Sequence, residues 1–311
     1  ERAAAGHREL MDGQACDALA GEGGVDEVDA ALSAPVHPRQ HNQPIRFIIF
    51  ASYGNDSCAL IQWAHECDLT GVVVVYSDTG WAADGWEERV REKEDWVRSL
   101  GFRAERTTSI GFQDLAREKQ GFPTQRYQWC SFRLKIEPGI RWLAEHDPEA
   151  RAVCLVGVRQ EESDKRANFP EYLVNSGNHG GRVMIAPFAQ FTEEARDSYL
   201  QRARVEPLPH RSRECLCINS NRKDMRAFTE SDIERIEAIE AEVGRPMFRP
   251  HRHLGAKGIR EIMEWARSEP GRYKRNQQEL DLRMPEPDPV ASDELPEEEN
   301  IMGCDTGWCG R

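Results

Sequence analysis

The hydrophobic pattern between residue 46 and about residue 200 alternates short apolar runs with longer amphipathic stretches. Four of the apolar runs are typical of buried strands: Phe47–Phe50, Gly71–Ser77, Phe102–Thr107 and Ala152–Val158. Between them, apolar residues recur at helical spacing in three stretches: Ala59–Glu66, Trp86–Leu100 and Phe132–His146. Strands that alternate with helices in this way predict an α/β fold with a doubly wound, mostly parallel sheet. A ligand is then expected at the carboxyl ends of the strands.

The same pattern divides the chain into four parts. Residues 1–44 are rich in Ala, Gly, Asp and Glu, and we expect a flexible leader there. Residues 45–204 carry the strand and helix pattern and are expected to form one α/β domain. Residues 205–282 contain two amphipathic helical patterns and two cysteines, which predicts a helical, cysteine-containing C-terminal part. Residues 283–311 combine a Pro-rich, acidic linker with a cysteine-bearing tail.

The formal net charge of the 311-residue chain is −13. An acidic protein of this kind is not coated for non-specific nucleic-acid binding, although residues 202–213 form a local basic cluster. That cluster suits a nucleic acid or a nucleotide phosphate, or it balances the acidic linker. No apolar stretch approaches the ~20 residues that span a bilayer, and no signal peptide is visible. We therefore expect a cytoplasmic protein that does not bind membranes.

A polar loop follows the first predicted strand and precedes the first predicted helix. It consists of Ser52, Tyr53, Gly54, Asn55, Asp56 and Ser57. A strand, a loop of small residues and a helix together place backbone N–H groups around a phosphate. In such a loop Gly54 permits close approach of the backbone, and Asp56 suits a Mg²⁺ ion that bridges phosphates. The loop lacks the Gly-Lys-Ser/Thr ending of a Walker A motif, and on its own an ordinary capped turn explains it equally well.

Two further predicted strands end in polar residues. These residues are Asp78, Thr79 and Gly80 after the second strand, and Gly157, Arg159 and Arg166 after the fourth. Because parallel strands end at one edge of the sheet, we expect both sets to lie beside the first loop. Asp78 suits a metal or a ribose, or it caps a turn. The arginines suit phosphate, or they form surface ion pairs.

Residues 126–135 collect cations, aromatic rings and a thiol immediately before a helix. A phosphate contact from Lys135 and stacking of an aromatic ring on a base would fit this composition. A solvated helix start with a buried Trp129 is the alternative interpretation.

Together, these segments resemble the adenine nucleotide α-hydrolase group, on its PAPS reductase branch. The matching pieces are Ser52–Ser57, Asp78-Thr79-Gly80, Trp129-Cys130 with Leu134-Lys135, Gly157-x-Arg159 with Glu162-Ser163 and Arg166, and Pro187-Phe188 with Phe191-Thr192 and Tyr199. They follow the family order and cover roughly residues 46–220. The resemblance implies a PP-loop site that binds ATP or a sulfated adenosine nucleotide.

The resemblance also implies roles for the residues of that site. In ATP-using members the loop holds the pyrophosphate and Mg²⁺, and ATP is split between its α- and β-phosphates. The nucleotide would contact Ser52, Tyr53, Gly54, Asn55, Asp56, Ser57, Asp78, Thr79, Gly80, Gly157 and Arg159. Asp56 would bind magnesium, Arg159 and Arg166 would neutralise the departing pyrophosphate, and Lys135 completes the expected catalytic set.

Five of the nine cysteines stand in polar, Gly-rich or Arg-rich surroundings: Cys130, Cys215, Cys217, Cys304 and Cys309. In a reducing compartment such cysteines indicate metal or redox chemistry rather than disulfides. We expect Cys215, Cys217, Cys304 and Cys309 to hold a [4Fe-4S] cluster or zinc, with Cys130 as an alternative ligand. The Cys-x-Cys spacing departs from the Cys-x-x-Cys common in the family. Two other interpretations stay open: a catalytic Cys309 thiol, or exposed thiols without a role.

The resemblance thus predicts an ATP pyrophosphatase, which converts ATP to AMP and pyrophosphate and activates an acceptor by adenylylation for sulfur transfer. In type it is similar to the DNA phosphorothioation proteins DndC and SspD, in which DNA is the acceptor and a cysteine desulfurase supplies sulfur. The expected partners are therefore a cysteine desulfurase, other proteins of the modification pathway and DNA. The alternatives are a PAPS or APS reductase that uses Cys309, and a nucleotide-binding subunit that docks a partner.

Overall fold

The computed structural model describes residues 44–124, 127–164, 166–248 and 257–268. Its centre is a six-stranded sheet in the order β3-β2-β1-β4-β6-β5. The strands are β1 (Phe47–Phe50), β2 (Val72–Asp78), β3 (Arg103–Thr108), β4 (Val153–Leu155), β5 (Tyr172–Ser176) and β6 (Arg182–Ile185). All neighbouring strands pair in parallel except β5, which runs antiparallel to β6. The predicted α/β fold with a mostly parallel sheet is confirmed.

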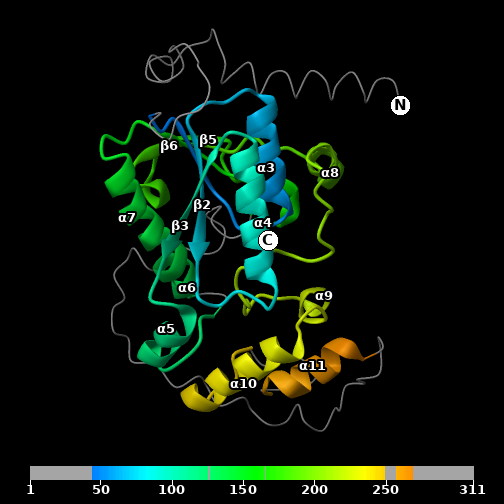
Figure 1. The fold of residues 1–311 in the computed structure, drawn as a ribbon. Helices are drawn as coiled ribbons and strands as arrows, with labels where there is room; N and C mark the ends of the chain where they lie inside the picture. Colours follow the sequence, from blue (N-terminus) through cyan, green and yellow to red (C-terminus); the bar gives the residue numbers. More distant parts are fainter. Residues whose placement is uncertain (1–43, 125–126, 165, 249–256, 269–311) are drawn as a thin grey trace.

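Helices cover both faces of this sheet (Figure 1). On one face, α3 (Asn55–Glu66) and α4 (Trp86–Ser99) share a core with Ile49 and Val74, and α8 (Glu193–Arg202) packs against α3. On the other face, α7 (Glu137–His146) shares a core with Ile48 and Val73. Successive strand residues point to opposite faces, so the continuous apolar runs of β1 and β2 bury both sides.

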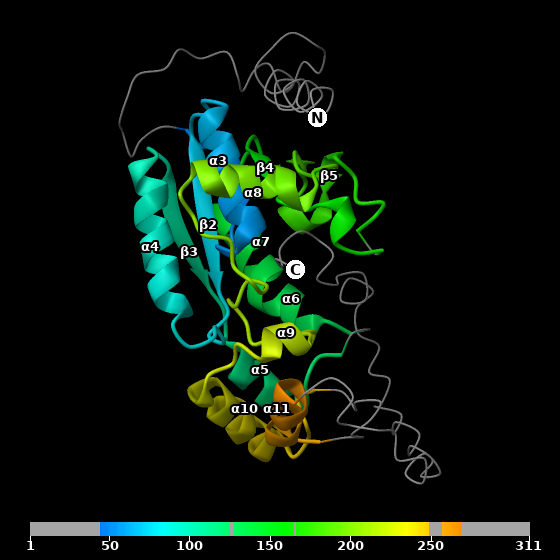
Figure 2. The same ribbon diagram turned by 90° about the vertical axis from the view of Figure 1, so that its right-hand side faces the viewer.

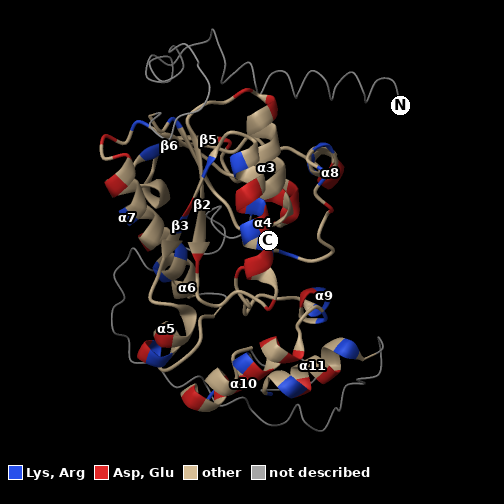
Figure 3. Cartoon of the chain, in the orientation of Figure 1, with Lys and Arg blue, Asp and Glu red and all other residues tan. Residues whose placement is uncertain are grey.

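A second core lies beyond the carboxyl end of β2, where α10 (Glu230–Val243) packs on α11 (Ile259–Arg267) and α5 (Phe112–Lys119) (Figure 1 and Figure 2). Thr229 caps α10, and Asp232 completes the capping box. The helix ends before Gly244, whose φ of 74° lies in the left-handed region. Acidic and basic positions mix along α4, α10 and α11 (Figure 3). In the residues described between 205 and 268, the C-terminal part is helical, as predicted.

The predicted helix Phe132–His146 is regular only from Glu137 onward. A short helix, α6 (Trp129–Ser131), and a π-helical turn, η1 (Phe132–Ile136), precede it. Pro138 has no N–H to donate to the carbonyl of Leu134, so regular α-helical pairing is interrupted at this point. The π turn carries Lys135, whose direction therefore differs from that in a regular helix.

The remaining helical segments are short: α9 (Arg222–Met225), η2 (Gln160–Glu162) and η3 (Gly177–His179). Among the residues described, no helix combines the length and the apolar character that a membrane crossing needs. The predicted leader, apart from Pro44, and the predicted linker and tail lie outside the described residues.

Candidate functional site

A cavity of about 520 Å³ lies at the ends of β1 and β4. The β1–α3 loop, the segment after β4, the first turn of α8 and residues from 208 to 224 form its walls. The predicted site residues that line it are Ser52, Gly54, Asn55, Asp56, Ser57, Gly157, Arg159 and Arg166. β1 and β4 are neighbours in the sheet, so two of the three predicted strand ends meet at one cavity.

The loop is held in shape by its own hydroxyl groups. The Gly54 N–H donates to Ser52 Oγ at 3.4 Å, and the Ser57 hydroxyl donates to the Gly54 carbonyl at 3.2 Å. Arg89 Nε donates to the Tyr53 carbonyl at 2.8 Å and fixes the loop from α4. The helix α3 begins at Asn55, so the free N–H groups of its first turn belong to the cavity wall. This arrangement suits an anion.

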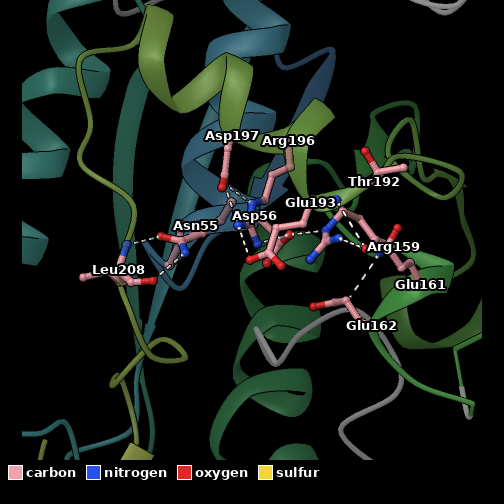
Figure 4. Close-up of polar contacts among 12 residues, drawn as sticks. Asn55, Asp56, Arg159, Glu161, Glu162, Thr192, Glu193, Arg196, Asp197 and Leu208 are labelled. Atoms are coloured by element: carbon pink, nitrogen blue, oxygen red, sulfur yellow. Dashed lines mark hydrogen bonds and ion pairs between the residues drawn. The ribbon is translucent and has the colours of Figure 1, made fainter. Parts of the chain in front are cut away.

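Asp56 links the loop to the end of β4 (Figure 4). Arg159 Nε donates to Asp56 Oδ1 at 2.7 Å, and the Arg159 side chain is only 6% exposed. Gly157 permits this approach, because a β-carbon there would lie 3.1 Å from the Asp56 carbonyl oxygen. A carboxylate that faces such a cavity is the kind of ligand that Mg²⁺ prefers.

A second ion pair lies behind the first. Arg166 donates to Glu162, and both side chains are almost completely buried. Burial raises the pKa of Glu162, and the negative charge of Asp56 raises it further, whereas Arg166 lowers it. Asp56 and Glu162 thus hold Arg159 and Arg166 in fixed positions at the cavity wall. An anion that entered the cavity would meet these two positive charges already in place.

Residues 205–213, which we call the strap, cross the loop and form the opposite wall. The Asn55 side chain donates to the Leu208 carbonyl at 3.0 Å and accepts from the Leu208 N–H at 2.8 Å. Ser212 packs directly on Gly54. The basic cluster at 202–213 thus partly enters the site, since His210 and Arg211 line the cavity.

Comparison with known proteins gives a match to the phosphoadenosine phosphosulfate reductase domain over residues 46–217, more than half of the chain. The chain belongs to this family. The matched range contains the whole loop, both arginines and the whole strap, so most of the cavity wall lies inside the family domain, and Asn221, Lys223 and Asp224 complete it from beyond residue 217. The predicted PAPS reductase branch is confirmed at this level.

An uncharacterized protein of Methanocaldococcus jannaschii is 34% identical over 116 residues, which is 37% of this chain and 23% of that protein. Among solved structures, a PAPS reductase from Candida auris in complex with phosphate is 15% identical, with a TM-score of 0.37, over 53% of this chain and 76% of that one. The U34-tRNA thiolase NcsA from Methanococcus maripaludis, solved with its [4Fe-4S] cluster, is 10% identical, with a TM-score of 0.40, over 76% and 75%. An NMN synthetase from Francisella tularensis is 10% identical, with a TM-score of 0.41, over 90% and 98%.

Four predicted nucleotide contacts lie elsewhere in this reductase-family domain. Tyr53 is fully buried and stacks on Tyr76, with ring centroids 5.8 Å apart, so its ring belongs to the core. The Asp78 carboxylate accepts from the Gly80 N–H at 2.9 Å and closes a turn. Thr79 donates to the Glu214 carbonyl at 2.7 Å. The strand-end rule therefore fails for β2, because the chain after the strap folds back over its end.

A smaller cavity of about 50 Å³ lies next to the first, and Arg211, Ser212 and Asp224 line both. The thiols that line it belong to Cys130, Cys215 and Cys217. Lys135 lines it too, with its Nζ 2.6 Å from Glu214 Oε1. Lys135 was expected in the catalytic set, and the π turn places it here, in the smaller cavity.

The three thiols agree in chemical kind with the predicted metal site. Burial raises the pKa of Cys215, and the nearby Cys217 and Cys130 raise it further. In the described part of the chain, however, no set of three His, Cys, Asp or Glu side chains is arranged to hold a metal ion. Cys304 and Cys309 lie outside the described residues, so the expected four-cysteine set is complete only with the tail.

Sequence reasoning missed the residues that reach the larger cavity from outside the strand ends. They include Arg196, Leu208, Ser212 and Lys223. Arg196 stands in a helix in which most positions are charged or polar, so its spacing gave no signal. The basic composition of residues 202–213 was the one available signal for the strap.

Proposed function

We propose that this domain binds ATP with Mg²⁺ in the 520 Å³ cavity and splits it between the α- and β-phosphates. The observation that carries the proposal is the pair of Asp56 and Arg159, which joins the loop after β1 to the segment after β4. A carboxylate suits the metal and a buried guanidinium suits the phosphate oxygens. The N-terminus of α3 adds backbone donors to the same wall.

In the proposed reaction an oxygen of the acceptor attacks the α-phosphorus of ATP. The bond from that phosphorus to the bridging oxygen breaks, and its electrons leave with pyrophosphate. Arg159 and Arg166 lie where they can stabilise the charge that develops on the leaving group. Asp56 would hold the Mg²⁺ ion, which would neutralise phosphate charge, and Arg159 would then contact the phosphate oxygens.

For the acceptor we propose a phosphate of the DNA backbone, as in phosphorothioation. The adenylylated phosphate would then be attacked by sulfide-level sulfur, and AMP would leave with the original oxygen. Sulfur from a cysteine desulfurase is at the persulfide level, so a thiol reductant must supply two electrons for its release. The support for sulfur transfer is the thiol-lined cavity that shares Arg211 and Ser212 with the nucleotide cavity.

We further propose that Cys130, Cys215 and Cys217, with one cysteine of the tail, hold a [4Fe-4S] cluster; zinc is the alternative. Iron and acid-labile sulfide in anaerobically purified protein, measured with a Cys217→Ser variant beside the wild type, test this assignment. If the protein contained neither iron nor acid-labile sulfide but held zinc in stoichiometric amount, a zinc site would be favoured over the cluster. No step of the proposed reaction passes through this group.

The first experiment is an assay for AMP and pyrophosphate with anaerobically purified protein, Mg²⁺, ATP and double-stranded DNA. Asp56→Asn keeps the size of the side chain and removes its charge, so we expect at least a 100-fold loss of turnover. Asp95→Asn is the matched control, because Asp95 lies on the exposed face of α4, where it pairs with Arg98, and it does not line the cavity. Equal loss in both variants, or no turnover by the wild type, would contradict the proposal.

Membership of this family supports a second candidate function, that of a PAPS or APS reductase. That reaction needs a thiolate to attack the sulfur of the nucleotide, and Cys309 is the expected nucleophile. Sulfite release from PAPS or APS with thioredoxin or glutathione, lost in Cys309→Ser, would establish it. A protein that binds nucleotide but turns over neither substrate would be the docking subunit.

A further inference from the structure

Helix α8 supplies a guanidinium to the cavity that no strand end provides. Arg196 lies in the first half of α8, lines the cavity and is 4% exposed. Its Nη1 lies 3.6 Å from Asp56 Oδ1, the same oxygen that accepts from Arg159 Nε at 2.7 Å. Two guanidinium groups from different elements therefore converge on one carboxylate oxygen at the cavity wall (Figure 4).

The rest of the Arg196 side chain is fixed by its own helix. Nε donates to Asp197 Oδ1 at 2.8 Å, and Nη2 donates to Glu193 Oε1 at 3.0 Å. Nη1 is the nitrogen that remains toward Asp56. Glu193 and Asp197 thus orient the guanidinium group of Arg196, and its Nη1 is directed toward Asp56, the proposed metal ligand.

The helix that carries Arg196 is itself tied to the phosphate-binding segments. Thr192 accepts from the Ala195 N–H at 3.2 Å and caps α8. The Glu193 N–H donates to Glu161 Oε1 at 3.4 Å, which links the start of α8 to the segment after β4. A guanidinium on such a support is pre-organised, so little side-chain entropy is lost when it binds an anion.

Arg159 Nε and Arg196 Nη1, the two nitrogens that face the cavity at Asp56, share a single carboxylate oxygen there, although each guanidinium also has acidic neighbours on its own segment. Burial costs each charge its hydration, and full compensation needs good hydrogen-bond geometry, which the 3.6 Å contact of Arg196 does not provide. In addition, Arg159 Nη1 is buried without a hydrogen-bond partner in the described part of the protein, and its ion-pair contact with Glu161 Oε1 is long, at 3.6 Å. An anion with several oxygens, placed beside Asp56, would accept hydrogen bonds from both guanidinium groups.

We propose that Arg196 binds the β- and γ-phosphates of a nucleoside triphosphate together with Arg159. This inference rests on the proposed ATP pyrophosphatase function and names the part of the substrate that α8 recognises. Asp56 holds the two guanidinium groups together in the free protein. With Mg²⁺ held by Asp56, both guanidinium groups would be available to bind the pyrophosphate portion of the substrate.

The test is a calorimetric titration of the full chain with Mg²⁺-pyrophosphate, the non-hydrolysable analogue AMPCPP with Mg²⁺, and AMP. For Arg196→Gln we expect about 10- to 100-fold weaker binding of pyrophosphate and AMPCPP, the cost of one charge-assisted contact. AMP has no pyrophosphate portion, so its affinity should change less than about threefold. Arg196→Lys keeps the positive charge but lacks the planar guanidinium, so its affinity for pyrophosphate and AMPCPP should lie between those of the wild type and Arg196→Gln.

Two control variants separate ligand binding from a structural role. Asp197→Asn removes the charge of one ion-pair partner of Arg196 but keeps a side-chain oxygen that can accept from Nε and orient the guanidinium, so pyrophosphate should bind as well as in the wild type or more tightly. If Arg196 only stabilised α8, Asp197→Asn and Arg196→Gln would weaken binding together, in step with their loss of thermal stability. Arg202→Gln removes a charge from the same helix at its pair with Glu66, outside the cavity, and should leave binding unchanged.

The outcomes for the two proposals are distinct. Wild-type protein that binds neither AMPCPP nor pyrophosphate contradicts the ATP pyrophosphatase itself. Tight wild-type binding that Arg196→Gln leaves intact, or an equal loss of affinity for AMP, overturns the role of Arg196 and leaves the proposed function in place.

Discussion

A β-carbon added to Gly54 would lie 2.8 Å from the β-carbon of Ser212, closer than two carbon atoms approach without displacement. The φ of Gly54 is −78°, a value that any residue adopts. The loop therefore needs glycine here because of the strap and not because of its backbone conformation. Substitutions at Gly54 and Ser212 can therefore test whether the strap packs on the loop in this way.

We predict that Gly54→Ala lowers the free energy of unfolding by about 1–3 kcal/mol, the usual cost of overpacking a close contact. Because Ser212 must move, the strap wall of the cavity shifts, and ATP turnover should fall as well. Urea unfolding and the pyrophosphate assay measure the two effects. Combining the change with Ser212→Gly should restore most of both, since the colliding atom is gone. A double variant with strictly additive losses would show that this contact is not the cause.

A second prediction concerns Tyr53, whose φ of 57° is unusual for a residue with a side chain. Its ring is fully buried, and in the described part of the structure its hydroxyl has no hydrogen-bond partner. Tyr53→Phe removes that hydroxyl and keeps the stacking on Tyr76, so stability should rise by about 1 kcal/mol. Denaturant unfolding of the two proteins measures the change. A loss of stability would mean that the hydroxyl is satisfied in solution.

The loop and the arginines after β4 could be predicted because their positions follow from local pattern and one topological rule. An apolar run gives the strand, the polar residues after it give its end, and parallel strands end at the same edge. The rule needs no knowledge of side-chain packing. It succeeded for Asp56 and Arg159, which are 103 residues apart in sequence and form a hydrogen bond.

The rest of the site depends on packing between distant segments without periodic pattern. The Asn55 side chain pairs with the backbone N–H and carbonyl of Leu208, 153 positions away, and these are groups that almost every residue carries. Thr79 lines the smaller cavity and not the larger one, because the chain around Glu214 covers the end of β2. Lys135 also lines the smaller cavity, where the π turn directs its side chain. Such long-range contacts and local turns arise only in the folded chain, so the residue types in the sequence do not predict them.

A third prediction is the acid sensitivity of the fold through His179. Burial, together with the smaller effect of the Arg182 charge, lowers its pKa from an ordinary value of 6.5 to about 4. The histidine is therefore neutral when folded, and its contribution to stability is present above pH 6.5 and lost as the pH falls toward 4. The loss by pH 4 is at most about 3 kcal/mol. Urea unfolding between pH 7 and 4 should show a flatter profile for His179→Gln than for the wild type, and parallel profiles would refute this assignment.

The last prediction decides what Lys135 does. Its Nζ lies 2.6 Å from Glu214 Oε1, and each side chain is 6% exposed. Lys135→Met leaves Glu214 charged and buried without its cation, so the free energy of unfolding should fall by about 3–5 kcal/mol. Lys135→Met with Glu214→Leu removes both charges and should recover most of that loss.

Urea unfolding measures the stabilities, and the pyrophosphate assay on the double variant separates the two roles of the lysine. If Lys135 serves only to hold the wall of the thiol-lined cavity, the stable double variant turns over ATP within about threefold of the wild type, because the pair lies outside the nucleotide cavity. A stable double variant that has lost ATP turnover 100-fold or more would return Lys135 to the catalytic set, through a movement that carries it from one cavity to the other.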